Sequence, residues 1–230
     1  MKKDIYFNFP VALMRGVLSG QKSVESFLSE AVDFHIYSHS VRIEDLNEYE
    51  ETDLQRFKRS ASYWEVNFGN PKAAMQKGKQ LFEKYAEGAA LVGINKDMFW
   101  DFYKGTKSSF QVECLIMFLA LRSILGKKKV VKTNNDLLII RMSGFKSAAE
   151  SFPEELFAMN RYQLDKIKTE LQTNWNLKYY SFYTRGFYIT FDMTLKELIT
   201  YAEGKKLSVK EEILKAEKKY LRDSIRNSLK

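Results

Sequence analysis

Two histidines, His35 and His39 in the segment HIYSH, are the only histidines in this sequence of 230 residues. Four residues apart on a helix, they would lie on one face, where two imidazoles could share a zinc ion. Zinc sites need at least three protein ligands. The neighbouring sequence adds only Asp33 and Glu44. The spacing therefore does not predict a metal site, and no cofactor is expected.

The sequence lacks the common catalytic motifs. It contains no Gly-rich phosphate loop, no CxxC pair, no HExxH and no GxSxG. The adjacent carboxylates of Glu154-Glu155 and Glu211-Glu212 would point in different directions on a helix, so neither pair suits acid–base catalysis. We therefore expect a protein that is not an enzyme and has no catalytic residues.

The single cysteine, Cys114, lies in the apolar run CLIMFLAL and cannot form an internal disulfide. A chain without disulfides fits a reducing compartment. The apolar run has eight residues, whereas a membrane span needs roughly 20. At the N-terminus Asp4 follows two lysines, which is not typical of a signal peptide. The sequence predicts a cytoplasmic protein without a membrane partner.

Basic residues are concentrated in the C-terminal part of the chain. Residues 1–104 have a net charge of −1, residues 105–193 of +5 and residues 194–230 of +4, for a total of +8. Basic surfaces attract the phosphate backbone of nucleic acids through counterion release. Positive charge also keeps proteins in solution, so charge alone does not decide between these two roles.

The segment RYQLDKIKTELQTNWN, residues 161–176, combines helical spacing with polar side chains that suit DNA. At about 100° per residue, an apolar face forms from Leu164, Ile167, Leu171 and Trp175. The outer face and its flanks carry groups that can bond phosphates or base edges, namely Arg161, Tyr162, Lys166, Lys168, Thr169, Gln172 and Thr173.

Two carboxylates, Asp165 and Glu170, flank the same outer face and would repel phosphate. Polar outer faces are also the rule on amphipathic helices that bind nothing. An ordinary surface helix therefore stays an alternative.

The segment YYSFYTRGFYITF, residues 179–191, predicts a β-hairpin, because two runs of β-forming residues flank the turn signal Arg185-Gly186. Alternation would bury one face and leave several tyrosines on the other. Tyrosine offers a flat ring and a hydroxyl to a nucleic acid or a protein. Arg185 at the tip could reach a phosphate or a narrow minor groove.

The elements that would position these residues begin near residue 107. SSFQVECLIMFLALRSILG predicts a central buried helix, and KKKVVK, with Lys127, Lys128 and Lys129, predicts an edge strand. TNNDLLIIRMSGF follows as a helix capped by Thr133 and ended by Gly144. With the helix and hairpin above, the order is helix, strand, helix, helix, strand, strand.

This order over about residues 107–192 resembles the winged-helix superfamily of helix-turn-helix proteins. The resemblance implies that the third helix enters the major groove of DNA and that the hairpin is a wing along the flanking backbone or minor groove. One departure is the connection between the second and third helices, which is longer than in a minimal helix-turn-helix. Its PEELFAM segment could add a helical turn.

The remaining segments frame this unit. Residues 1–104 predict a helical region, from apolar spacing in FPVALMRGVLSG, QKSVESFLSEAVDFHIYSHS, ETDLQRFKRSASYWEV and PKAAMQKGKQLFEKYAE. Residues 194–230 predict C-terminal helices. Their amphipathic segment LSVKEEILKAEKKYLRDSIRNSLK is expected to pack on its own domain, with a homodimer as the alternative.

The sequence thus predicts a mostly α, α+β protein with a helical region (1–104), a winged-helix-like domain with a β-hairpin (105–193) and C-terminal helices (194–230). Its expected function is non-enzymatic binding of double-stranded DNA, as a transcriptional regulator or a replication or mobile-element accessory. A protein-interaction module built on a winged helix is the alternative. The expected DNA contacts are Arg161, Tyr162, Lys166, Lys168, Thr169, Thr173 and Arg185, with backbone charge added by Lys127, Lys128 and Lys129.

Overall fold

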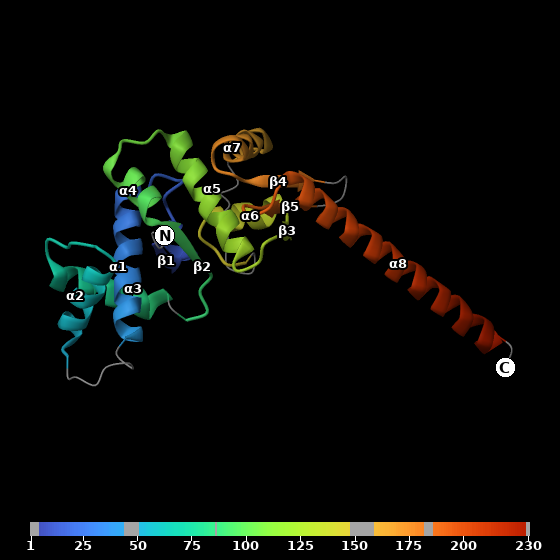
Figure 1. The fold of residues 1–230 in the computed structure, drawn as a ribbon, viewed down its shortest axis with the longest axis horizontal. Coiled ribbons are helices and arrows are strands. Elements are labelled where there is room, and N and C mark those ends of the chain that lie inside the picture. The colour runs from blue at the N-terminus through green and yellow to red at the C-terminus, as the bar shows by residue number, and fades with distance from the viewer. Residues whose placement is uncertain (1–4, 44–50, 86, 148–158, 182–185, 229–230) are drawn as a thin grey trace.

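The computed structural model describes residues 5–43, 51–85, 87–147, 159–181 and 186–228, with side chains up to Lys219 in the last range. Most of these residues are helical, and two small antiparallel sheets complete the fold. The predicted α+β class is therefore confirmed. One long helix, α8 (Leu195–Ser228), extends away from the rest of the molecule (Figure 1).

Helix α1 (Val24–Arg42) is the centre of the N-terminal half (Figure 1). The Ser23 hydroxyl caps its start by accepting a hydrogen bond from the backbone N–H of Ser26. Helices α2 (Asp53–Tyr63) and α3 (Pro71–Tyr85) pack against α1. Pro71 is the first residue of α3, as predicted, because a proline there gives up no internal hydrogen bond.

The expectation of helices alone in the first hundred residues is wrong, because a two-stranded sheet lies among them. Strand β1 (Tyr6–Pro10) pairs antiparallel with β2 (Leu91–Asn95), with Phe7 opposite Ile94. Phe7, Phe9, Val92 and Ile94 are buried, at the period of two that a strand requires. A 3-10 helix, η1 (Val11–Met14), replaces the α-helix expected over FPVALMRGVLSG, and α4 (Lys96–Lys104) follows β2.

The C-terminal half has the predicted order of elements. Helix α5 (Ser109–Leu125) is followed by β3 (Val131–Thr133), α6 (Asn135–Met142), α7 (Arg161–Asn174), β4 (Lys178–Ser181) and β5 (Phe187–Thr190). The three strands form a sheet in the order β3-β5-β4, so β3 is an edge strand as expected. Asn134, not Thr133, caps α6, because Thr133 still pairs with Phe187 in the sheet. Gly144, with a φ of +81°, follows the end of α6.

Helix α5 joins the two halves through one continuous core. Its side chains Leu115 and Ile116 are fully buried. The helix packs against β2 and η1 on the N-terminal side and against α6 and α7 on the other. The elements that carry the candidate site are therefore fixed to the N-terminal half by shared apolar packing.

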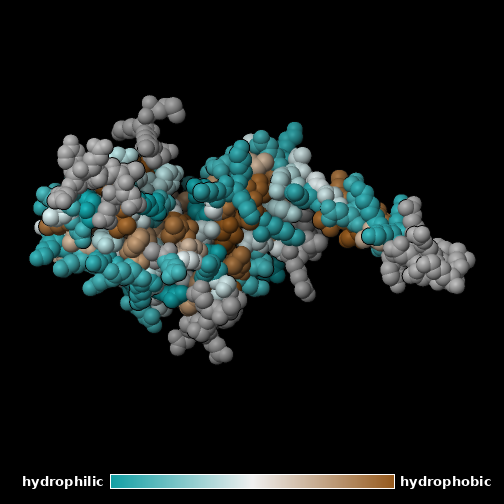
Figure 2. Space-filling view, turned by 90° about the horizontal axis from the view of Figure 1, so that it is seen from below, coloured by the Kyte–Doolittle hydropathy of each residue, from teal (hydrophilic) through white to brown (hydrophobic). Residues whose placement is uncertain are grey.

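Helix α8 departs from the expectation that the C-terminal segment packs on its own domain. Its first turns contact β4 and β5, where Leu198 and Ala202 are buried. From Gly204 to Lys219 every residue is exposed, and apolar residues appear among hydrophilic ones along the projecting helix (Figure 2). Packing on the domain thus ends within the first two turns or so.

Two buried ionisable side chains on α1 have opposite effects on stability in acid. Burial raises the pKa of Asp33 to about 6. Lys77, whose Nζ lies 4.0 Å from the carboxylate, lowers this pKa, and Glu30 raises it. Burial lowers the pKa of His35 to about 4, with further lowering by His39 and Arg42 and an opposing hydrogen bond from Asn8. Folded Asp33 takes up a proton before the unfolded chain does, and folded His35 takes one up after it.

We expect Asp33→Asn to make the protein more sensitive to acid. As the pH falls from 7 to 4.5, Asp33 contributes about 2 kcal/mol of stability, because the folded state binds its proton more tightly. His35 removes a similar amount over the same interval, so the two largely cancel in the wild type. The variant retains only the loss from His35. Urea unfolding at both pH values measures the change, and His35→Asn, which keeps an acceptor near Asn8, should shift it in the opposite direction. If the wild type, Asp33→Asn and His35→Asn all lose the same free energy of unfolding between pH 7 and pH 4.5, the buried environment of both groups is contradicted.

Candidate nucleic-acid interface

Helix α7 has one buried face and one exposed face, as its sequence predicts. The Asn160 side chain caps the helix by accepting a hydrogen bond from the Gln163 backbone N–H. Leu164, Ile167 and Leu171 are buried in the core. Trp175, just after the helix, is half-buried and its ring contacts Phe102 and Phe118. Because the apolar side is held by this packing, the opposite side is presented to solvent.

The exposed face of α7 contains most of the residues predicted to bind DNA. Tyr162 is 79% exposed, and the Arg161 side chain is 88% exposed. The hydroxyls of Thr169 and Thr173 donate to the backbone carbonyls four residues earlier, at 2.9 Å each, and their oxygens can still accept. Lys166 is also exposed. We call Arg161, Tyr162, Lys166, Thr169 and Thr173 the α7 polar row.

Charges on and around this row are mixed. Arg161 Nε lies 3.9 Å from the Asp165 carboxylate, which partly neutralises the only arginine of the row. Lys166 Nζ lies 4.7 Å from the centre of the Phe110 ring, a cation–π contact with α5. Glu170 accepts a hydrogen bond from the Asn174 amide at 2.7 Å. A phosphate would compete with these exposed contacts, which are individually weak.

Lys168 does not lie on the exposed face, which corrects its prediction as a DNA contact. Only 4% of the residue is exposed, and its ammonium donates to Asn135 Oδ1 at 2.8 Å and to Asp165 Oδ1 at 3.3 Å. It also lies over the rings of Tyr179 and Phe187. Burial lowers the pKa of Lys168. The side chain therefore joins α7 to α6 and to the hairpin and is not available to a phosphate.

The three lysines after α5 are exposed but precede the end of β3 that is remote from Gly186. Lys127, Lys128 and Lys129 precede β3, in which Val131 is opposite Ile189 and Thr133 is opposite Phe187. The chain thus enters the sheet at the end remote from Gly186 and runs towards the turn. Lys132, exposed on β3, lies close to Gly186, since its Cε is 3.4 Å from where a Cβ of residue 186 would lie. Alternation in KKKVVK could have singled out Lys132, since it points away from Val131 and Thr133.

The predicted hairpin is confirmed by the antiparallel pairing of β4 with β5, in which Tyr180 is opposite Tyr188. Arg185 lies outside the described residues. The described hairpin tyrosines, Tyr179, Tyr180 and Tyr188, are half-buried and not free as expected. Tyr180 donates to the Glu203 carboxylate at 3.1 Å, and Tyr188 contacts the ring of Tyr201. The start of α8 therefore covers the hairpin face that was expected to offer tyrosines to a partner.

The histidines lie apart from this surface. His39 Nδ1 is 3.0 Å from Ser60 Oγ of α2, while Asp33 faces Lys77 of α3, and Glu44 lies outside the described residues. Within the described ranges, no three histidine, cysteine or acidic side chains are grouped so that they could hold a metal ion. None of the described helices is both long and apolar enough to cross a membrane.

Comparison with known proteins gives no match: no protein-family profile, curated protein or solved structure is significantly similar to this chain.

Proposed function

We propose that this protein binds double-stranded DNA without catalysing a reaction, through the α7 polar row and the turn between β4 and β5. The observation that carries the proposal is the exposure of five adjacent polar side chains on α7 that can bond phosphates and base edges. The element order and the sheet order β3-β5-β4 agree with a winged-helix unit, in which α7 is the third helix. A cytoplasmic role in transcription or in replication of a mobile element is part of the same proposal.

The arrangement assigns different roles within the interface. Arg161 and Lys166, the exposed cations of the row, contact phosphates, while Tyr162, Thr169 and Thr173 offer hydroxyls to phosphates or base edges. Asp165 lies beside the row, next to Arg161, and weakens binding at phosphates close to it. Arg185 and Lys132 supply positive charge at the hairpin, and Lys127, Lys128 and Lys129 act only through the longer-range field.

The test is a titration of the full chain with random duplex DNA at two salt concentrations. Wild-type binding should weaken as salt is added, because phosphate contacts release counterions. The double variant Arg161→Ala/Lys166→Ala should bind roughly tenfold more weakly at moderate salt, with a salt slope lower by about two if two phosphate contacts are lost. The control Lys58→Ala/Lys72→Ala removes the same charge from exposed positions on α2 and α3. Binding that is insensitive to salt, or equal losses in both double variants, would contradict the proposed interface.

A protein-interaction module is the second candidate, supported by the apolar side chains exposed on α8. Leu207 is 60% exposed, Val209 53%, Ile213 52% and Leu214 54%. Exposed apolar residues on a projecting helix favour association with another helix, which a second copy of the chain could supply. In that case the protein would sediment as a dimer and show no salt-dependent binding of duplex DNA.

A further inference from the structure

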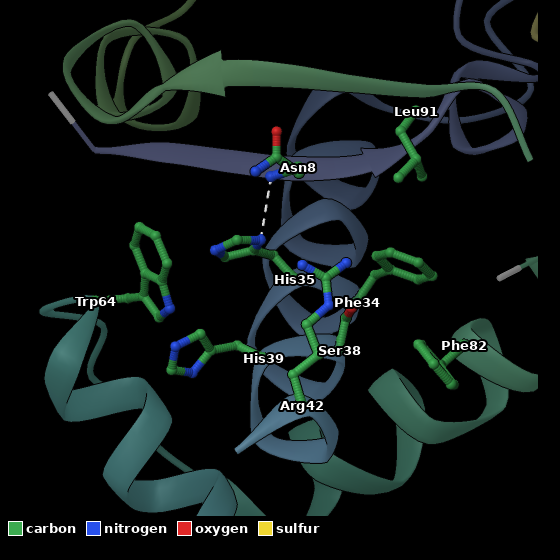
Figure 3. Close-up of a pocket in the computed structure, with 9 residues that line it drawn as sticks. All are labelled: Asn8, Phe34, His35, Ser38, His39, Arg42, Trp64, Phe82 and Leu91. Atoms are coloured by element: carbon green, nitrogen blue, oxygen red, sulfur yellow. Dashed lines mark hydrogen bonds between the residues drawn. The ribbon is translucent and has the colours of Figure 1, made fainter. Parts of the chain in front are cut away.

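A cavity of about 400 Å³ lies in the N-terminal half, between α1, α2, α3 and the β1-β2 sheet, remote in the fold from α7 (Figures 1 and 3). Its size falls within the range of roughly 300–1,000 Å³ that is common for small-molecule sites. The residues that line it are Asn8, Phe34, His35, Ser38, His39, Arg42, Trp64, Phe82 and Leu91. Among the described residues, no aspartate or glutamate belongs to this lining.

His35, one of the lining residues, has a buried hydrogen-bond donor without a partner among the described residues. Its Nδ1 accepts the backbone N–H of Asn8 at 3.1 Å, so Nδ1 carries no proton. The ring is neutral near pH 7, because burial lowers its pKa to about 4. The proton must therefore be on Nε2, which is buried and has no hydrogen-bond partner among the described residues. With the residue only 7% exposed, leaving such a donor unpaired is destabilising.

Trp64 adds a second donor of the same kind. Its Nε1 is also buried without a hydrogen-bond partner in the described part of the chain. The Trp64 ring lies 4.5 Å from the ring of His35 and 5.5 Å from that of His39, both edge to face. Figure 3 shows the three rings gathered on one side of the cavity, with the second nitrogen of His35 directed toward the Trp64 side. Two unpaired N–H groups on residues of one lining point to an acceptor that the described residues do not supply.

Arg42 supplies a positive charge to the lining of the cavity. It is exposed at the C-terminal end of α1, and its guanidinium extends along the helix toward His35 (Figure 3). Burial lowers the pKa of His39, and the positive charges of Arg42 and Arg59 lower it further. A cation and N–H donors, with no carboxylate among the described lining residues, favour an anion.

The opposite wall is apolar. The rings of Phe34 and Phe82 lie 5.9 Å apart, and Leu91 is 45% exposed. A hydrated inorganic ion would leave these surfaces without contact, whereas a flat organic body would cover them. Burial of one phenyl-sized group there removes apolar surface from water, which favours binding.

We propose that this cavity binds a small aromatic anion. Its acidic group accepts the Nε2–H of His35 and pairs with Arg42, and its ring lies against Phe34, Phe82 and Leu91. Trp64 closes the site beside the two histidines and donates its N–H to the same ligand. This function is separate from DNA binding and stands whether or not α7 contacts DNA.

Benzoate is the probe, and benzamide is its neutral match in size and shape. We expect benzoate to raise the melting temperature of the full chain and to shift the indole N–H resonance of Trp64, assigned by its absence in Trp64→Phe. For a ligand this small the dissociation constant should be about 1 mM. Benzamide should bind at least tenfold more weakly. Phenyl phosphate in place of benzoate distinguishes a carboxylate site from a phosphate site.

Two variants separate the anion site from a general effect on stability. Arg42→Ala, at an exposed position, should fold normally and weaken benzoate binding about tenfold, whereas Lys72→Ala on the surface of α3 should leave it unchanged. If benzoate shifts neither the melting temperature nor the Trp64 resonance, the cavity holds only water. If benzamide and benzoate bind equally, the site does not recognise an anion. Either result overturns the proposal.

Discussion

Gly78→Ala is expected to lower the free energy of unfolding by about 3 kcal/mol, although alanine is the better helix former, because overpacking against backbone is costly. Gly78 lies buried in the middle of α3. A Cβ at this position would lie 2.5 Å from the backbone oxygen of Asp33 and 2.8 Å from the Cβ of Tyr37, both on α1. Neither atom belongs to the flexible end of a side chain, so the two helices must move apart.

Gly204→Ala is the matched control for this prediction. Gly204 is also helical, but it lies in the exposed part of α8, and no atom lies within 4 Å of where its Cβ would be. The same substitution should therefore stabilise α8 locally by about 0.5–1 kcal/mol. Urea unfolding of the wild type and both variants gives the two differences. If Gly78→Ala is as harmless as Gly204→Ala, the close approach of α1 and α3 is not present in solution.

The α1–α3 contact also bears on the cavity. Phe82 is one turn after Gly78 on α3, and it forms part of the apolar wall opposite His35. A shift of α3 away from α1 would therefore widen the proposed ligand site. We expect benzoate to bind Gly78→Ala more weakly even at temperatures where that variant is fully folded.

Strong local patterns made much of the C-terminal half predictable. Helix α5 is apolar on nearly all sides, which identifies a buried central helix without knowledge of its partners. The Arg185-Gly186 signal between β-forming runs identified the hairpin, and its pairing is observed. These features depend on residues close in the sequence, so a single chain is enough to find them.

The first sheet could not be found in the same way, because its strands are about eighty residues apart in the sequence. LVGIN is only five residues long, and the FPVALM segment has apolar residues at spacings that also suit a helix. Pro10 was the available signal, since it cannot donate a helical hydrogen bond and it ends strand β1.

Lys168 illustrates a different limit within the candidate interface. It lies four residues after Leu164 and three before Leu171, so helical spacing places it on the inner side. Its charge suggested the surface, but its long apolar stem and its hydrogen bond to Asn135 allow burial.

The cavity in the N-terminal half could not be predicted from the sequence for another reason. His35 becomes an unpaired donor only when β1 supplies the Asn8 N–H, and that pairing depends on tertiary structure.

Gly186→Val is expected to destabilise the protein by about 3 kcal/mol, because strain of a β-branched residue at positive φ adds to a steric collision. Gly186 has a φ of +104°, and a Cβ there would lie 2.6 Å from the backbone oxygen of Thr133. Gly126→Val is a control for strain alone, since Gly126 has a φ of +57° and no atom within 4 Å of its Cβ position. The difference between the two losses in the free energy of unfolding measures the cost of the close approach of Gly186 to β3.

Arg185→Ala, one position earlier, should separate stability from binding. The sequence predicts that Arg185 is not needed for the turn, so its loss should change the free energy of unfolding by no more than about 0.5 kcal/mol. Under the proposed function it should nevertheless weaken DNA binding at moderate salt and lower the salt slope by about one. Gly186→Val should reduce binding only in proportion to the fraction unfolded. If Arg185→Ala leaves affinity and salt slope unchanged in a protein that does bind DNA, the hairpin is not a wing, and its strands serve only to anchor α7 and α8 to the core.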